Sequence, residues 1–222
     1  MLDQINHTFT PPSNIKYLNS KVPKDYSDIW TGNPDGFGSP SKDILGYILE
    51  GVTQSRTLVD IASGNGRYAI ELARNPKLVV TAIEISSTGR DLIDRRAKEE
   101  GLVVTAIQAD ILTYTECNQY DLVVSSGLLE ELENVKDQAD AIKKMQSMVK
   151  PEGRIILRYC LKISNRKPEQ RTNPDFVRYF FGEDCWNILT HFSSRSTTNN
   201  TKSTINDGEN TIQTQTLVAT KR

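Results

Sequence analysis

A glycine loop between a strand-like and a helix-like segment carries the residues best placed to do chemistry. Residues 58–62 form an apolar run typical of a buried parallel strand, and residues 68–73 place apolar side chains at helical spacing. Gly64 and Gly66 lie between them, where the backbone must turn sharply and approach a ligand. Because the following helix points its N-terminus at the loop, the segment predicts a site for a nucleotide-like cofactor.

The loop by itself fits two classes of cofactor. Residues 64–69 match the G-x-G-x-x-G/A pattern of dinucleotide-binding proteins. The next strand-like run, residues 78–83, is followed by Glu84, where a carboxylate could accept hydrogen bonds from both hydroxyls of a ribose. Either nucleotide cofactor would use this carboxylate, so the rest of the chain must distinguish the two classes.

Three further strand-like runs follow in a regular order. Residues 102–111 form a third run that closes on Asp110. Residues 120–129 form a fourth, which breaks into a Ser-Ser-Gly loop, and residues 154–159 form a fifth after a helical stretch that runs through Val149. Strands that alternate with helices in this way indicate an α/β fold built on a mainly parallel sheet.

This ordered set resembles the class I S-adenosylmethionine-dependent methyltransferase family over residues 58–159, and more loosely to the C-terminus. The motifs that carry the resemblance are Asp60 with the glycine loop, Glu84, residues 109–111, residues 121–126 and residues 150–154. The resemblance implies a three-layer Rossmann-like sandwich of the α/β class, whose mostly parallel seven-stranded sheet ends in an antiparallel C-terminal hairpin. An Asp-Gly pair at 207–208, between β-branched runs at 193–205 and 211–220, fits that hairpin.

The resemblance also implies which residues bind S-adenosylmethionine, whose reaction product is S-adenosylhomocysteine. Asp60, Gly64 and Gly66 would serve the amino-acid part and Glu84 the ribose. Ala62 stands where the family usually has glycine, so the junction between strand and loop is bulkier here. The full set implied for the cofactor is Tyr26, Asp60, Ala62, Gly64, Gly66, Glu84, Ile85, Asp110, Ile111 and Ser125, with Asp110 and Ile111 at the adenine and Ser125 beside the sulfonium.

Candidate acceptor residues follow the fourth and fifth strands. Glu130 is the catalytic candidate, since a carboxylate there could bind an amine or take a proton; alternatively, an acidic first helical turn complements the helix dipole. Arg158 and Tyr159 could hold an acidic or phenolic acceptor, or serve as surface charge and packing. Trp30 lies four residues after Tyr26 on one face of a predicted short helix. It is predicted either to bind the substrate or to dock this helix onto the core. No metal site is predicted.

Composition agrees with one α/β domain. The chain has 222 residues, 37% of them hydrophobic, and a formal net charge of -1, which provides no overall field that would attract nucleic acid. No leader-like or membrane-spanning pattern is present, and three dispersed cysteines indicate reduced thiols, so a cytoplasmic protein is expected. We predict a domain at 41–222, which starts with a helix at 41–49, preceded by a segment at 1–40 that could act as a lid.

The sequence therefore predicts methyl transfer to a small polar molecule, with nucleic acid not expected as a partner and the oligomeric state not predicted. A non-catalytic S-adenosylmethionine-binding subunit and an RNA methyltransferase stay open as alternatives.

A short-chain NAD-dependent oxidoreductase would need a Tyr-x-x-x-Lys pair downstream of the loop, but Tyr17 and Lys21 lie upstream of it. Residues 125–128 are not an Asn-Pro-Pro-Tyr-like loop, which argues against enzymes that methylate amino groups of DNA bases or glutamine. Two helical pieces, 175–181 and 185–189, are predicted after the fifth strand.

Overall fold

The structure, a computed structural model, describes residues 26–35, 38–132, 134–163, 172–198 and 210–222. In chain order the elements are α1 (Ser27–Gly32), α2 (Lys42–Leu49), β1 (Arg56–Ile61), α3 (Arg67–Ala73), β2 (Leu78–Glu84), α4 (Ser87–Glu100), β3 (Val104–Gln108), β4 (Tyr120–Ser126), the short 3-10 helix η1 (Leu129–Glu131), α5 (Val135–Ser147), β5 (Val149–Ile163), α6 (Pro174–Tyr179), β6 (Trp186–Thr198) and β7 (Asn210–Lys221). The predictions for Tyr17, Lys21 and the turn at 207–208 lie outside the described residues.

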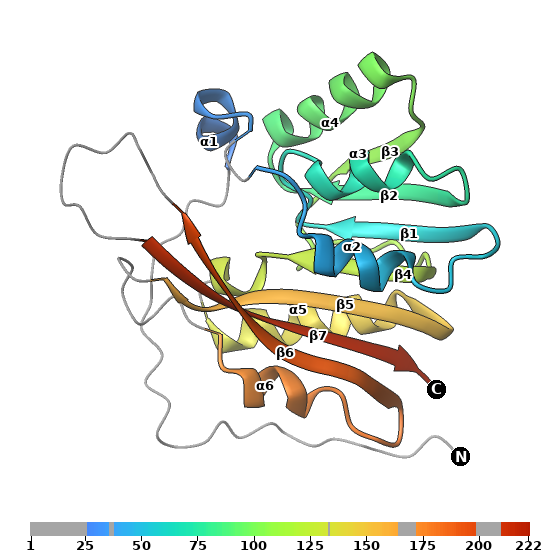
Figure 1. Ribbon diagram of the computed structural model, residues 1–222, viewed down its shortest axis with the longest axis vertical. Coiled ribbons are helices and arrows are strands. Elements are labelled where there is room, and N and C mark those ends of the chain that lie inside the picture. The colour runs from blue at the N-terminus through green and yellow to red at the C-terminus, as the bar shows by residue number, and fades with distance from the viewer. Residues whose placement is uncertain (1–25, 36–37, 133, 164–171, 199–209) are drawn as a thin grey trace.

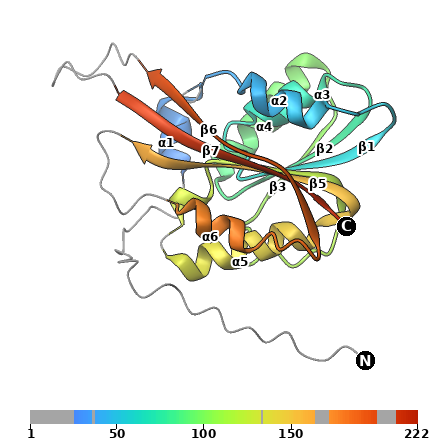
Figure 2. The same cartoon turned by 60° about the horizontal axis from the view of Figure 1, so that its bottom comes forward.

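The strands form one sheet in the order β3-β2-β1-β4-β5-β7-β6 (Figure 1). Strands β1 to β5 run parallel, whereas β7 is antiparallel to both β5 and β6. Figure 2 shows α2, α3 and α4 over one face of the sheet and α5 and α6 over the other. The predicted three-layer sandwich, with a mostly parallel seven-stranded sheet that ends in an antiparallel pair, is confirmed.

Strand β1 shows why the centre of the sheet forms. Val59 and Ile61 belong to the core cluster that includes Ile142 of α5, whereas Leu58 belongs to the cluster that includes Ile93 of α4. All five side chains are fully or almost fully buried. A strand covered by helices on both faces is apolar along its whole length, which is why residues 58–62 read as a continuous apolar run.

The prediction of a helix at 185–189 is wrong, because β6 begins at Trp186 and pairs with Lys221 of β7. Trp186 is buried and Asn187 is exposed, the two-residue period of a strand. A short run whose apolar spacing fits both a helix and a strand is ambiguous until a partner strand is present. The partner of this run lies more than thirty residues away in the sequence. Helices at 41–49 and 175–181 are confirmed as α2 and α6.

Strand β5 is longer than the predicted run at 154–159. It starts at Val149, directly after α5, and includes residues 150–153, which lie between the predicted helical stretch and the predicted strand. Glu152 adopts a left-handed φ of 60° in this stretch, and the pairing of β5 with β4 shifts register here. The added length at the other end, through Ile163, pairs with β7. Strand β5 therefore extends beyond the last residue of β4 with which it pairs, and β5 and β7 continue as an antiparallel pair past that edge of the sheet.

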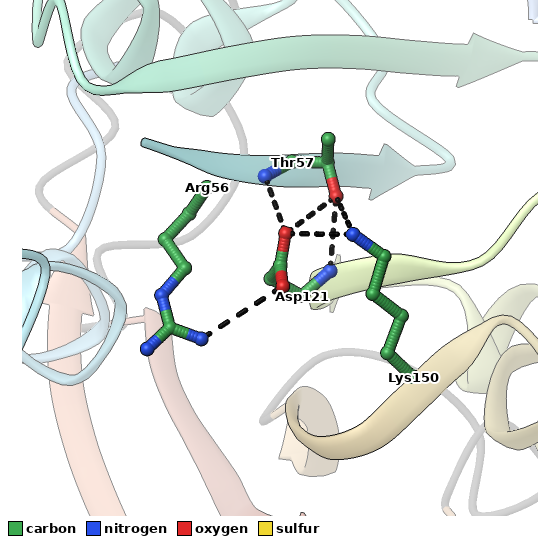
Figure 3. Close-up of polar contacts among 4 residues, drawn as sticks. All are labelled: Arg56, Thr57, Asp121 and Lys150. Atoms are coloured by element: carbon green, nitrogen blue, oxygen red, sulfur yellow. Dashed lines mark hydrogen bonds and ion pairs between the residues drawn. The ribbon is translucent and has the colours of Figure 1, made fainter. Parts of the chain in front are cut away.

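A polar cluster ties the opposite, N-terminal ends of β1, β4 and β5 together (Figure 3). Asp121 Oδ2 accepts hydrogen bonds from the backbone N–H of Thr57 at 2.8 Å, from its hydroxyl at 2.7 Å and from Lys150 Nζ at 3.0 Å. Arg56 Nη1 lies 3.8 Å from the other carboxylate oxygen. Burial alone would raise the pKa of Asp121, but the hydrogen bonds from Thr57 and Lys150 outweigh it and hold this pKa at about 2.

Replacing Asp121 with asparagine is expected to destabilise the protein by about 2 kcal/mol at neutral pH, the scale of hydrogen bonds to a charged group. Because the folded pKa lies below the ordinary 3.8, the carboxylate contributes fully above about pH 4. Its contribution is lost as the pH falls towards about 2. Urea unfolding of both proteins along a pH series measures this. Asp140→Asn, which removes an exposed helical ion pair with Lys136, is the control and should change stability little.

Candidate functional site

The predicted cofactor residues gather at the C-terminal edge of the parallel strands. The chain runs from β1 outward through β2 to β3, and then returns to place β4 on the other side of β1. The strand order therefore reverses between β1 and β4, and such switch points leave a crevice where ligands bind in open α/β sheets. Helix α1 lies at this edge of the sheet (Figure 1).

The glycine loop needs its glycines for two different reasons. Gly64 and Gly66 have left-handed φ values of 58° and 77°. A Cβ atom on Gly66 would also come within 2.6 Å of Cγ1 of Ile93 in α4, closer than real Cβ contacts. The loop is therefore strained for any other residue and is packed directly against a neighbouring helix.

Ala62 also has a left-handed φ, 56°, which explains why glycine is usual at this position in the family that the sequence resembles. Ala62→Gly is expected to stabilise the protein by ~0.5–1 kcal/mol, because it relieves the left-handed strain, ~1–2 kcal/mol, at the entropic cost of a glycine, ~0.5–1 kcal/mol. Thermal unfolding measures the change. Glu152→Gly, at a left-handed residue remote from the loop, should give a similar gain; a loss of stability in Ala62→Gly would contradict the strain.

Glu84 braces the loop from the end of β2. Its Oε2 accepts a hydrogen bond from Gly64 N at 2.7 Å and its Oε1 accepts one from Ser86 N at 3.0 Å. The residue is only 4% exposed. These hydrogen bonds hold the carboxylate at the glycine loop, the position at which the sequence predicts contact with a ribose.

Asp60 is a buried carboxyl at the end of β1, with an exposed fraction of 1%. Its Oδ2 has no hydrogen-bond partner in the part of the chain that the structure describes. Burial raises the pKa of Asp60 to about 7, although the positive charge of Arg67 opposes this shift. Such a group fits a ligand that donates hydrogen bonds and carries positive charge.

Arg67, the first residue of α3, is a site residue that the sequence reasoning missed. Its guanidinium lies 5.1 Å from the centre of the Tyr68 ring. Burial lowers the pKa of Arg67; the Tyr68 hydroxyl opposes that shift, and the positive charge of Arg158 lowers the pKa further. Its position directly after Gly66, at the start of the helix, is the signal that could have indicated it.

Four more of the predicted cofactor residues lie at this edge with local structural roles. Ser125 donates its hydroxyl hydrogen to the Ile61 carbonyl at 3.0 Å, which links β4 to β1. Asp110 Oδ1 accepts a hydrogen bond from Leu112 N at 2.9 Å in the turn after β3. Ile111 is buried in the core, and Ile85 directly follows Glu84 and is half-buried.

Helix α1 crosses from the glycine loop to the far side of the switch point. A Cβ atom on Gly64 would come within 2.8 Å of the Trp30 ring, which is 5% exposed. At the other end of the helix, Tyr26 donates its hydroxyl hydrogen to Glu131 Oε2 of η1 at 2.8 Å. The next loop is held as well, because Pro34 O accepts hydrogen bonds from Asn65 and Arg96. The structure thus brings Trp30 onto the cofactor loop, with Tyr26 beside η1.

Glu130 lies in η1, directly after the loop at Gly127, and is 8% exposed. Burial raises the pKa of Glu130, although hydrogen bonds from its own backbone and from the Cys160 thiol and backbone oppose the shift. Burial and the negative charge of Glu130 also raise the pKa of Cys160, which keeps the thiol protonated. Among the described residues, Oε2 of Glu130 has no hydrogen-bond partner.

Arg158 and Tyr159 point to opposite faces of β5, because side chains alternate along a strand. Tyr159 is fully buried in the core on the α5 side, where its hydroxyl is 3.0 Å from Nε2 of His191. Arg158 is half-buried and donates from Nε to Thr214 Oγ1 of β7 at 3.3 Å. The structure thus places the two predicted acceptor residues on opposite faces of β5.

Comparison with known families decides the class of this fold. Residues 58–153, from β1 through the start of β5, match a family model described as a methyltransferase domain. This segment is therefore similar to that methyltransferase family. The matched residues include the glycine loop, Glu84 and Glu130, whereas α1 and the paired ends of β5 and β7 lie outside them.

The names of similar proteins indicate different methyl acceptors. EEF1A lysine methyltransferase 2 of Danio rerio is 26% identical over 143 residues, 61% of this chain and 60% of the relative. A ubiquinone biosynthesis O-methyltransferase of Serratia proteamaculans is 30% identical over 116 residues, 50% of this chain and 46% of the relative. The chain thus spans about half to three fifths of the length of these curated relatives.

Solved structures agree on the fold. N-methyltransferase NodS from Bradyrhizobium japonicum, determined in complex with S-adenosylhomocysteine, superposes with a TM-score of 0.61 at 14% identity. The match covers 81% of this chain and 84% of NodS. A similarity of this extent includes elements outside residues 58–153 and supports the fold of the whole sandwich.

The described residues also bear on membrane-spanning helices and metal sites. None of their helices has the length and apolar character needed to cross a lipid bilayer. No group of three or more His, Cys, Asp and Glu side chains among them is arranged to hold a metal ion. The cytoplasmic location and the lid at 1–40 stay predictions.

Proposed function

We propose that this protein is an S-adenosylmethionine-dependent methyltransferase that acts on a small polar molecule. The observation that carries the proposal is the buried Asp60 carboxyl, with one oxygen unpaired within the described chain, directly before the glycine loop. A buried carboxyl is stabilised by a charged donor, and S-adenosylmethionine carries an ammonium group next to a carboxylate. Asp60 would bind the ammonium group and Arg67 the carboxylate.

The remaining cofactor residues fit the other parts of the same molecule. Glu84 would accept hydrogen bonds from the ribose hydroxyls, Ile85 and Ile111 would flank the adenine, and Asp110 would accept from its amino group. The complex of NodS with S-adenosylhomocysteine supports this cofactor for a chain of the same fold. Helix α1 would cover it through Tyr26 and Trp30.

When bound, S-adenosylmethionine supplies a methyl group made electrophilic by the sulfonium. The chain aligns the acceptor for in-line attack, and alignment of this kind contributes on the order of 7–11 kcal/mol. Glu130 would accept the proton of an attacking O–H or N–H group, or bind an amine, through its buried Oε2. A small acceptor is supported by the burial of Glu130 and by α1, which spans from Gly64 to η1.

Calorimetry with S-adenosylmethionine, S-adenosylhomocysteine and NAD(H) tests the cofactor. We expect both sulfur compounds to bind and NAD(H) not to bind. Glu84→Ala should weaken binding by about tenfold to a hundredfold, as expected when hydrogen bonds to a charged group are lost. Glu100→Ala, which removes an exposed carboxylate paired with Arg74, should bind like the wild type.

A screen of small polar metabolites, read out as formation of S-adenosylhomocysteine, then tests turnover. Binding without turnover, including no turnover of proteins or RNA, would favour a non-catalytic S-adenosylmethionine-binding subunit. Binding of NAD(H) alone would favour an oxidoreductase and overturn the proposal.

A further inference from the structure

Arg158 occupies a central position at the C-terminal edge of the sheet. Ile61 of β1, Ser125 of β4 and Leu157 of β5 form one row of aligned residues. Arg158 lies one residue beyond this row, beside Ser126 of β4 and level with the start of the glycine loop. Its side chain is on the α2–α4 face of the sheet, the face to which alternation also assigns Asp60.

The guanidinium of Arg158 is half-buried and has no carboxylate partner among the residues that the structure describes. Its one hydrogen bond within the described chain runs from Nε to the hydroxyl of Thr214, a buried residue of β7. By contrast, Arg154, four residues earlier on the same strand, bonds the Tyr47 carbonyl and pairs with Glu50. A half-buried guanidinium with one neutral hydrogen-bond partner is stabilised by a planar or tetrahedral oxyanion that accepts two hydrogen bonds.

The charges around Arg158 leave it available for such an anion. Arg67 is near enough for the two positive charges to disfavour each other, and Asp60 balances Arg67. Cys160, two residues farther along β5 on the same face, contacts Glu130. Arg158 therefore lies between the residues proposed for the amino-acid part of the cofactor and the carboxyl proposed to face the attacking atom.

We infer that the methyl acceptor carries a carboxylate or a phosphate group that pairs with Arg158. S-adenosylmethionine has one carboxylate, which the proposed function assigns to Arg67, so Arg158 is a second cation that the cofactor does not require. The acceptor would thus present its anionic group to Arg158 and its attacking O–H or N–H to Glu130. This inference rests on the proposed function of the same site.

Binding of small anions tests the inference without knowledge of the acceptor. Benzoate, phenyl phosphate and the neutral benzamide are titrated into the full chain, with and without S-adenosylhomocysteine, and followed by saturation-transfer NMR. We expect at least one anion to bind and benzamide to bind at least about tenfold more weakly, the scale of a charge-assisted hydrogen bond. Preference for benzoate or for phenyl phosphate distinguishes a carboxylate from a phosphate acceptor.

Arg158→Gln should weaken anion binding by about tenfold to a hundredfold and leave the affinity for S-adenosylhomocysteine unchanged. Arg158→Lys should retain part of the binding, since it keeps the charge but not the paired donors. Arg154→Gln removes the same charge from the same strand and should bind the anions like the wild type. Circular dichroism checks that each variant is folded.

Three results would overturn the inference. These are binding of neither anion to the wild type, equal binding of benzoate and benzamide, or an Arg158→Gln variant that loses affinity for S-adenosylhomocysteine but not for the anion. The last result would assign Arg158 to the cofactor. Failure of S-adenosylhomocysteine to bind any variant would instead count against the proposed function, while anion binding to Arg158 would still be measured.

Discussion

Glu130→Gln is expected to lower the rate of methyl transfer by about 10²–10⁴-fold, the usual contribution of a general acid or base. Glutamine keeps the shape and the hydrogen bonds of the side chain but cannot take a proton from the acceptor. Because burial raises the pKa of Glu130, the wild-type rate should increase with pH as this carboxyl ionises. A pH–rate profile of both proteins measures the effect, and the variant should lack that limb of the profile.

The same substitution separates a catalytic from a structural role of Glu130. A carboxyl whose folded pKa is raised above its unfolded value binds more protons in the folded state, so it reduces stability as the pH rises. Glu130→Gln should therefore be at least as stable as the wild type at neutral pH, although far less active. Glu131→Gln, which can still accept the hydrogen bond from Tyr26, is the control and should keep most of its activity. If Glu130→Gln were as active as Glu131→Gln, Glu130 would not be the proton acceptor of the reaction.

Gly66→Ala is expected to destabilise the protein by about 2–5 kcal/mol. Left-handed φ costs an alanine about 1–2 kcal/mol, and forcing its Cβ against Ile93 adds about 1–3 kcal/mol of overpacking. The added methyl would push the glycine loop and the start of α3 away from α4. Denaturant unfolding measures the stability, and calorimetry should show weakened binding of S-adenosylhomocysteine.

Gly101→Ala is the matched control for this prediction. Gly101 ends α4 with a φ of 66°, but a Cβ atom there would meet nothing within 4 Å. The substitution should cost only the backbone term of about 1–2 kcal/mol and leave cofactor binding intact. If both variants lost the same stability, contact with Ile93 would not explain the glycine at position 66.

The central sheet and the cofactor edge could be predicted from the sequence because their signals are local. A strand buried on both faces is a continuous apolar run, and a left-handed turn between strand and helix calls for residues such as Gly64 and Gly66. The departure at Ala62 was visible in the sequence for the same reason. In contrast, the strand at Trp186 was predicted as a helix, because its partner β7 is distant in sequence and the short run fits both periods.

The sequence by itself determined the order of strands and helices from β1 to β5, the glycine loop and the carboxylates at the ends of β1 and β2. Only the tertiary structure decided which polar side chains meet, because burial and charge depend on neighbours from other strands. It placed Arg67 beside Asp60 and Arg158, joined Glu130 to Cys160, and moved Tyr159 into the core with His191. Side-chain alternation along β5 separates Arg158 from Tyr159, and the packing of β7 and the helices against that strand sets the surroundings of each.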